Sequence, residues 1–290
     1  MHLFVAGAGG AVGRSLVPRL LAAGHRVTGT SRSEAGAARL RAGGAEAVQV
    51  DVLDADALRD AVVAAAPDAV LHMLTDLSGA DGAANSRLRH EGTRHLVDAA
   101  RAAGVGRIVA QSIAWAYAPG ADPADESVPL DLGAPEPRGA TVAAVDALER
   151  MSAELPEAVV LRFGLLYGPG TWYAPDGAAA AALRGEPGPP FLGSVAPDAA
   201  VSSFVHVDDA ASAAVAALDW PSGPVNVVDD EPAPARLWVP VLAAAVGAPP
   251  PEPVASDERP GWARGARADL ARSRGWHPSR PTWRTGFPAM

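Results

Sequence analysis

The chain has 290 residues, 49% of them hydrophobic, which is typical of a globular protein that buries a sizeable core. Its net charge of -9 disfavours nucleic acid and anionic lipid as partners, because binding to them relies on a basic surface. The chain has no cysteine, which excludes disulfides, thiolate nucleophiles and zinc–thiolate sites.

The first half of the sequence alternates short apolar runs with amphipathic stretches, a pattern typical of βαβ units that build a parallel sheet. Strands are predicted over residues 2–6, 26–30, 47–50, 69–73, 107–111 and 158–162. Helices are predicted between them, over residues 11–23, 34–42, 55–65, 86–103 and 142–155. Gly24, Gly43 and Gly104 each follow a predicted helix, where a left-handed glycine commonly ends the helix.

The second half is less regular. Residues 168–190 and 232–260 are rich in proline and glycine and are predicted to form loops and small cap elements. Strands are predicted over 201–207 and 225–228, with a helix over 208–218 between them. The apolar start has no basic leader and proline interrupts the longer apolar runs, so we expect a cytoplasmic protein without a membrane partner.

A glycine-rich loop follows the first predicted strand directly and opens the first predicted helix. Glycines in this context permit a tight turn and let the backbone approach a pyrophosphate at the positive end of the helix. The predicted fold class is α/β, a Rossmann doubly wound parallel sheet with a small C-terminal substrate-binding cap. The dinucleotide-binding core is expected at 1–165, with 201–229 returning to it, and the cap at 166–200 and 230–290. The predicted cofactor-binding residues of the loop are Gly7, Gly9, Gly10, Ala11, Val12 and Gly13.

The end of the second predicted strand indicates which dinucleotide binds. An acidic residue at this place usually binds the ribose hydroxyls of NAD. Here the chain has Ser31 and Arg32, and a guanidinium flanked by hydroxyls suits the 2′-phosphate of NADP. NADP(H) is therefore the predicted cofactor. The competing interpretations are a solvated surface arginine and, because Glu34 is near, a site for NAD.

Further motifs lie at residues 51–52, 70–74, 112–117, 161–168 and 206–209. Together with the glycine-rich loop they resemble the extended short-chain dehydrogenase/reductase family, of the NAD-dependent epimerase/dehydratase type. The resemblance implies three groups of cofactor contacts, in the order adenine, pyrophosphate with ribose, and nicotinamide. These are Asp51 and Val52, then Met73, Leu74 and Thr75, and finally Phe163, Gly164 and Leu165.

The chain departs from this family at the catalytic residues. The family's tyrosine and lysine fall at Thr141 and Val145, and all 24 Lys and Arg residues of the chain are arginine. The family's serine falls at Ile113, with Ser112 one residue earlier as the candidate catalytic residue. Neither threonine nor valine transfers a proton at neutral pH, so the usual general acid and the lysine that tunes it are both missing.

Several aromatic and basic side chains are predicted to bind the substrate. Arg89 replaces an asparagine that the family keeps near its active site, while His206 matches a histidine that ties a strand to its following helix. Tyr173 either faces a flat substrate or belongs to a small local core under its loop. No spacing of acidic residues and histidine suggests a metal. The candidates are Arg89, Ile113, Trp115, Tyr117, Trp172, Tyr173, Phe191 and His206.

Three functions are consistent with these observations. The favoured one is an NADPH-dependent ketoreductase that positions an aromatic ketone for hydride transfer, with the proton supplied by substrate or water. The chain resembles the atypical actinobacterial ketoreductases that tailor aromatic polyketides, angucyclinone reductases among them, which also lack the tyrosine. A nucleotide-sugar epimerase or dehydratase is disfavoured by the missing base, and a non-catalytic NADP(H)-binding sensor is the third candidate. The sequence leaves the oligomeric state open.

Overall fold

The computed structural model describes residues 1–75, 82–187, 195–252, 254 and 256–290. Contacts divide the chain into two compact units, which are described separately here. The first unit comprises Met1–Ser112, Pro135–Leu161 and Ala211–Pro224, and the second comprises Ile113–Ala134, Arg162–Ala210 and Val225–Met290. Within the described ranges no helix combines the length and the apolar character that crossing a membrane requires. The predicted boundaries of core and cap stay a prediction.

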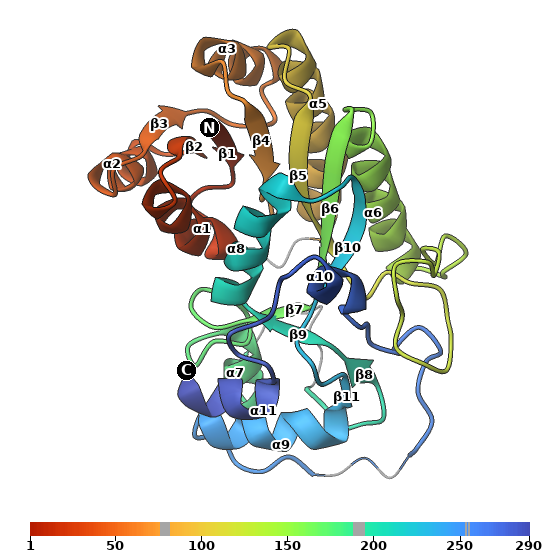
Figure 1. Cartoon of the computed structure of the whole chain (residues 1–290). Helices are drawn as coiled ribbons and strands as arrows, with labels where there is room; N and C mark the ends of the chain where they lie inside the picture. The colour runs from red at the N-terminus through yellow and green to blue at the C-terminus, as the bar shows by residue number, and fades with distance from the viewer. Residues whose placement is uncertain (76–81, 188–194, 253, 255) are drawn as a thin grey trace. The chain divides into compact units, whose positions relative to one another are not determined.

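A seven-stranded sheet has the order β10-β6-β5-β4-β1-β2-β3 (Figure 1). Neighbouring strands from β3 to β5 pair in parallel, as βαβ connections require. The sheet with its flanking helices confirms the predicted Rossmann-like α/β fold class. The strands are β1 (His2–Ala6), β2 (Arg26–Ser31), β3 (Glu46–Gln49), β4 (Ala69–His72), β5 (Arg107–Ile113), β6 (Glu157–Phe163) and β10 (Gly223–Val227).

Helices in the first unit bury their apolar stripes against this sheet. In Figure 1 α3 and α5 lie side by side, and their leucine and valine side chains form one core cluster with residues of β1, β4 and β5. Helices α1 and α2 contact β2. The helices are α1 (Ala11–Ala22), α2 (Glu34–Ala42), α3 (Ala55–Ala65), α4 (Gly82–Arg87), η1 (Leu88–Gly92), α5 (Thr93–Ala102), α6 (Arg138–Ser152) and η3 (Ala217–Asp219). Helix α8 (Val207–Ala216) begins in the second unit and continues into the first from Ala211.

The structure corrects two details of the first half. The single helix predicted over 86–103 is three segments, because a π-helical turn, η1, separates α4 from α5. One inserted residue leaves the apolar periodicity nearly unchanged, so the sequence did not reveal it. Gly43 is the C-cap of α2, as predicted, but the positive φ after this helix is at Gly44, at +89°, whereas Gly24 and Gly104 have a positive φ themselves. Gly43 still donates its N–H to Arg39, which extends the last helical turn by one residue.

The second unit packs around aromatic side chains. The predicted strand over 201–207 is divided into β8 and β9, which pair with different partners, β11 and β7. The core of this unit contains Tyr167, Tyr173, Phe204, Trp238, Trp283 and Phe287. Its remaining elements are β7 (Leu165–Tyr167), α7 (Ala178–Leu183), β8 (Val201–Ser202), β9 (Phe204–His206), β11 (Ala233–Pro234), α9 (Ala235–Ala245), α10 (Asp269–Ser273), α11 (Trp283–Gly286) and η4 (Phe287–Ala289).

Candidate cofactor and substrate site

The glycine-rich loop is a tight turn between β1 and α1. Gly7 has a φ of +90°, and its carbonyl accepts a hydrogen bond of 3.0 Å from the N–H of Gly10. A Cβ on Gly7 would lie 2.3 Å from the carbonyl oxygen of Met73, and one on Gly13 would lie 2.2 Å from that of Gly7. Both glycines are therefore required by backbone that passes too close for any side chain.

The same loop offers a cradle for a pyrophosphate. Helix α1 has Gly10 at its N-cap, makes no side-chain cap hydrogen bond and has no acidic residue in its first turn. Gly9 is exposed, and a Cβ built on it meets nothing within 4 Å. The first N–H groups of α1 consequently face open space with the positive end of the helix dipole behind them. This arrangement fits the phosphates of a dinucleotide, with Ala11, Val12 and Gly13 supplying that first turn.

The end of β2 carries an exposed arginine. Arg32 is exposed, and its backbone carbonyl accepts a hydrogen bond from Gln49 Nε2. The hydroxyl of Ser31 donates to the carbonyl of Ser33, whose own hydroxyl accepts from Gly36 and caps α2. Both hydroxyls thus shape the turn that presents Arg32. The nearby Glu34 forms an ion pair of 2.7 Å with Arg41.

The ends of β3, β4 and β5 carry the next predicted cofactor residues. Asp51 is exposed, and its carboxylate accepts from the N–H of Leu53, while Val52 and Met73 are buried. Thr75 donates its hydroxyl hydrogen to the carbonyl of Leu74 and accepts from Gln111 Nε2 at 2.9 Å. Gln111 was not among the predicted cofactor residues, although its place near the carboxyl end of β5 was a signal for it.

The catalytic positions of the family lie on one face of α6. Thr141, Val145 and Glu149 are spaced by four residues, which places them on that face. Val145 is buried, and Thr141 and Glu149 are half-buried. The hydroxyl of Ser112 donates to Glu149 Oε1 at 2.7 Å. Glu149 was not among the residues predicted for the site.

His72 and Arg89 lie at the carboxyl end of β4. His72 is fully buried, and its Nε2 lies 2.8 Å from the hydroxyl oxygen of Thr93. Burial lowers the pKa of His72 to about 4, and the positive charge of Arg89 contributes in the same direction. Burial also lowers the pKa of Arg89 itself. His72 is therefore neutral at physiological pH and cannot serve as a proton donor.

Other predicted residues belong to the second unit. The N–H of Ala114 donates to the carbonyl of Phe163, and the hydroxyl of Tyr117 donates to Asn226 Oδ1 at 2.5 Å. The guanidinium of Arg162 lies 4.9 Å from the centre of the Tyr117 ring. Ile113 and Trp115 are half-buried, as is Leu165. Gly164 allows close packing, since a Cβ on it would lie 2.7 Å from the carbonyl oxygen of Ser203.

The aromatic candidates of the long loop have different surroundings. Tyr173 is buried, packs edge-on against Phe204 and Trp238 at 5.4 and 5.9 Å, and has its pKa raised by burial to about 12. Trp172 is half-buried, whereas Phe191 lies outside the described residues. His206 is buried, and its Nδ1 accepts from the N–H of Asp208. These contacts match the local-core interpretation of Tyr173 and the strand-to-helix interpretation of His206.

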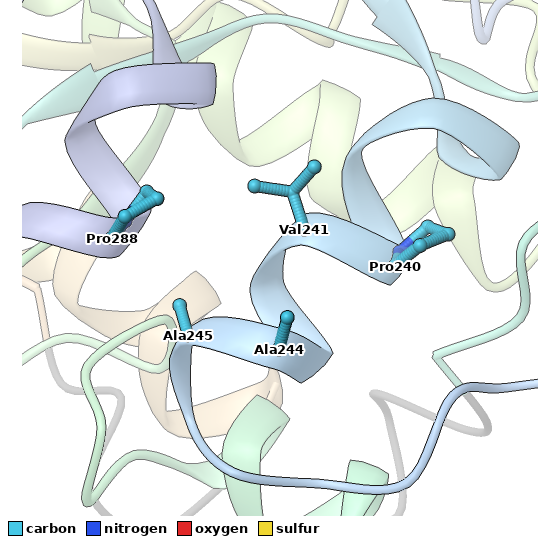
Figure 2. Close-up of a pocket in the computed structure, with 5 residues that line it drawn as sticks. All are labelled: Pro240, Val241, Ala244, Ala245 and Pro288. Carbon is cyan, nitrogen blue, oxygen red and sulfur yellow. The ribbon is translucent and has the colours of Figure 1, made fainter.

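The second unit also has an apolar groove between α9 and η4. Figure 2 shows the residues that line it, which are Pro240, Val241, Ala244, Ala245 and Pro288. None of these side chains offers a hydrogen bond or a titratable group, so the groove has no chemistry of its own. Across the described ranges, no group of three or more His, Asp or Glu side chains is placed to hold a metal ion.

Residues 3–228 match the family described as the NAD dependent epimerase/dehydratase family. A 3-diazoavenalumate denitrifying reductase from a Streptomyces species is 47% identical over 99% of both chains. The crystal structure of the Thermus thermophilus UDP-glucose 4-epimerase complex with NAD superposes with a TM-score of 0.75 and 25% identity, over 99% of this chain and 97% of that one.

A third match shows the shared fold alone. The UDP-Glc/GlcNAc 4-epimerase of Campylobacter jejuni has a TM-score of 0.77 but only 17% identity, over 99% of this chain and 97% of that one. The matches thus place a reductase nearer in sequence than the sugar epimerases, and they support binding of a nicotinamide dinucleotide.

Proposed function

The chain belongs to the NAD-dependent epimerase/dehydratase family, and we propose that within it the protein is a nicotinamide-dependent reductase acting on a diazo-bearing carboxylate. The observation that carries this proposal is the identity of 47% to the Streptomyces denitrifying reductase over nearly the whole of both chains. The name of that relative specifies a diazo group, a carboxylate and a reduction that removes nitrogen.

The chemistry of this reaction agrees with the residues on α6. An arenediazonium ion that accepts a hydride at its terminal nitrogen becomes a neutral diazene. The diazene releases N2 as its N–H hydrogen moves to the ring carbon, so every atom and charge is accounted for. No alkoxide forms, and no side chain has to donate a proton. A reductase of this kind does without the tyrosine and lysine that Thr141 and Val145 replace.

The cofactor, when bound, supplies the hydride. In the first unit the residues proposed to hold it are the glycine-rich loop, the first turn of α1, Asp51, Val52, Met73, Leu74 and Thr75. NADP(H) is the proposed form, because Arg32 is exposed at the end of β2 and Glu34 is held by Arg41. Phe163, Gly164 and Leu165 of the second unit stay proposed nicotinamide neighbours on the family resemblance.

An aromatic ketone is the second candidate substrate, on the resemblance to atypical ketoreductases that also lack the catalytic tyrosine. Reduction of a ketone leaves an alkoxide that needs a proton, and with no side-chain acid a phenol beside the ketone would supply it. Methylation of that phenol should then slow the reduction strongly. If the methyl ether is reduced at the normal rate, the substrate does not supply the proton.

The experiment incubates the purified chain and NADPH with diazotised 3-amino-4-hydroxycinnamate, and follows NADPH oxidation together with N2 release. The matched control is Gly9→Val, whose side chain would occupy the open space over the loop. We expect equimolar NADPH oxidation and N2 release with the wild-type chain, well above the rate in the control. A rate equal to that of the control, or turnover only with an aromatic ketone carrying the same carboxylate, would overturn the diazo proposal.

A further inference from the structure

Arg89 faces the sheet from the π-helical turn η1. It precedes the buried Thr93 by four residues, close to one turn of the π-helical segment, so the two residues share a face of the helix. Its neighbours Arg87, His90 and Glu91 are exposed, whereas Arg89 is half-buried. A long basic side chain in this orientation is directed away from bulk solvent, unlike most surface arginines.

The fold fixes which end of the sheet Arg89 approaches. Helix α5 returns from the end of β4 to the start of β5, so its first turn and η1 lie near the carboxyl end of β4. The hydrogen bond between Thr93 and His72, the last residue of β4, fixes this position. In open α/β sheets ligands bind outside the carboxyl ends of the strands.

Among the described residues, no acidic side chain compensates the charge of Arg89. No carboxylate in the part of the chain that the structure describes forms an ion pair with Arg89, whereas Arg87 pairs with Glu91 at 2.8 Å and Arg94 with Glu154 at 2.8 Å. The positive charge of Arg89 acts on His72, which is itself basic, is buried and has an Nδ1 without a hydrogen-bond partner among the described residues. A partly buried guanidinium without an acid is stabilised by an anionic ligand.

We propose that Arg89 binds the carboxylate of the substrate and makes the chain selective for carboxylate-bearing hydride acceptors. This inference rests on the proposed reductase function and names the residue that recognises the carboxylate of the substrate. The planar guanidinium offers two parallel N–H donors that match the two oxygens of a carboxylate. The anion could also be a cofactor phosphate, and the test separates the two sources.

The test measures binding without turnover, so it stands apart from the test of the reaction. NADP⁺-loaded protein is titrated by calorimetry with 4-hydroxycinnamate and with its methyl ester. In Arg89→Gln we expect the acid to bind roughly tenfold to a hundredfold more weakly, with the ester and NADP⁺ unchanged. Arg89→Lys, which keeps the charge without the fork, should lie between, and Arg87→Gln should behave as wild type.

Three results would overturn the proposal. An equal loss for acid and ester means that Arg89 is structural, and a matching loss of NADP⁺ affinity means that it binds a cofactor phosphate. Failure of the wild-type chain to bind the acid more tightly than the ester also overturns it. If selectivity for the acid depends on Arg89 while the diazo compound is not reduced, then the proposed reaction fails and the carboxylate site stands.

Discussion

The hydroxyl of Ser112, at the end of β5, donates a hydrogen bond of 2.7 Å to Oε1 of Glu149 on α6. Ser112 is buried, and Glu149 shares its helix face with Thr141 and Val145. The bond ties the candidate serine to a carboxylate that itself only accepts hydrogen bonds when ionised. Ser112 therefore has a clear structural role, and a catalytic role can be tested against it.

Replacement of Ser112 by alanine should lower the free energy of unfolding by about 1 kcal/mol, because the hydrogen bond from Ser112 to Glu149 is lost. The effect on kcat should stay below about tenfold, far from the 10²- to 10⁴-fold that a general acid contributes. Urea unfolding and steady-state kinetics measure the two quantities. A thousandfold loss of kcat with unchanged substrate binding would make Ser112 a general acid after all.

Arg32→Ala should weaken NADPH binding roughly tenfold to a hundredfold and leave NADH binding nearly unchanged, since a charge-assisted contact contributes about 1.5 to 3 kcal/mol. Fluorescence titration with both cofactors measures this. The control is Arg39→Ala, an exposed arginine in the last turn of α2. Equal losses of affinity for NADPH and NADH would show that Arg32 does not bind the 2′-phosphate.

Two glycines of the loop should separate folding from cofactor binding. In Gly13→Ala the new Cβ would lie 2.2 Å from the carbonyl oxygen of Gly7, so we expect a loss of stability of about 3 kcal/mol or more. In Gly9→Ala the Cβ meets nothing within 4 Å, so the thermal midpoint should not change while NADPH affinity falls. A Gly9→Ala variant that binds NADPH as tightly as wild type would argue against a pyrophosphate at this loop.

Asp229 should make stability depend on pH. Burial raises its pKa to about 7, against hydrogen bonds from the N–H groups of Trp283 and Glu231 that lower it. The folded state therefore holds a proton that the unfolded state loses from about pH 4, and stability from this group falls as pH rises toward 7. One proton corresponds to a slope of at most about 1.4 kcal/mol per pH unit.

Urea unfolding from pH 4 to pH 8 tests this contribution. Asp229→Asn should flatten the decline, because the amide does not ionise. The neighbouring Asp230→Asn is the control, since Asp230 is exposed and pairs with Arg272. Identical pH slopes in wild type and Asp229→Asn would contradict the buried-proton explanation.

The sequence alone determined the elements that depend on local pattern. The order of strands and helices in the first half follows from apolar periodicity, and the helices over 34–42 and 55–65 have the predicted ends. Ser33 and Asp54 cap these helices with side-chain hydrogen bonds that residue type alone suggests. In the glycine-rich loop, the contact that requires Gly13 is with the backbone of Gly7 and Ala8, close in sequence, whereas the contact that requires Gly7 is with Met73, far along the chain.

Only the tertiary structure decided the contacts between residues far apart along the chain. The pairing of Ser112 with Glu149 and of His72 with Thr93 depends on how helices pack on the sheet, which local pattern does not encode. Arg89 lies in a π-helical turn, a single inserted residue that periodicity does not detect. Local propensity thus determined which elements form, while packing determined which polar groups they bury.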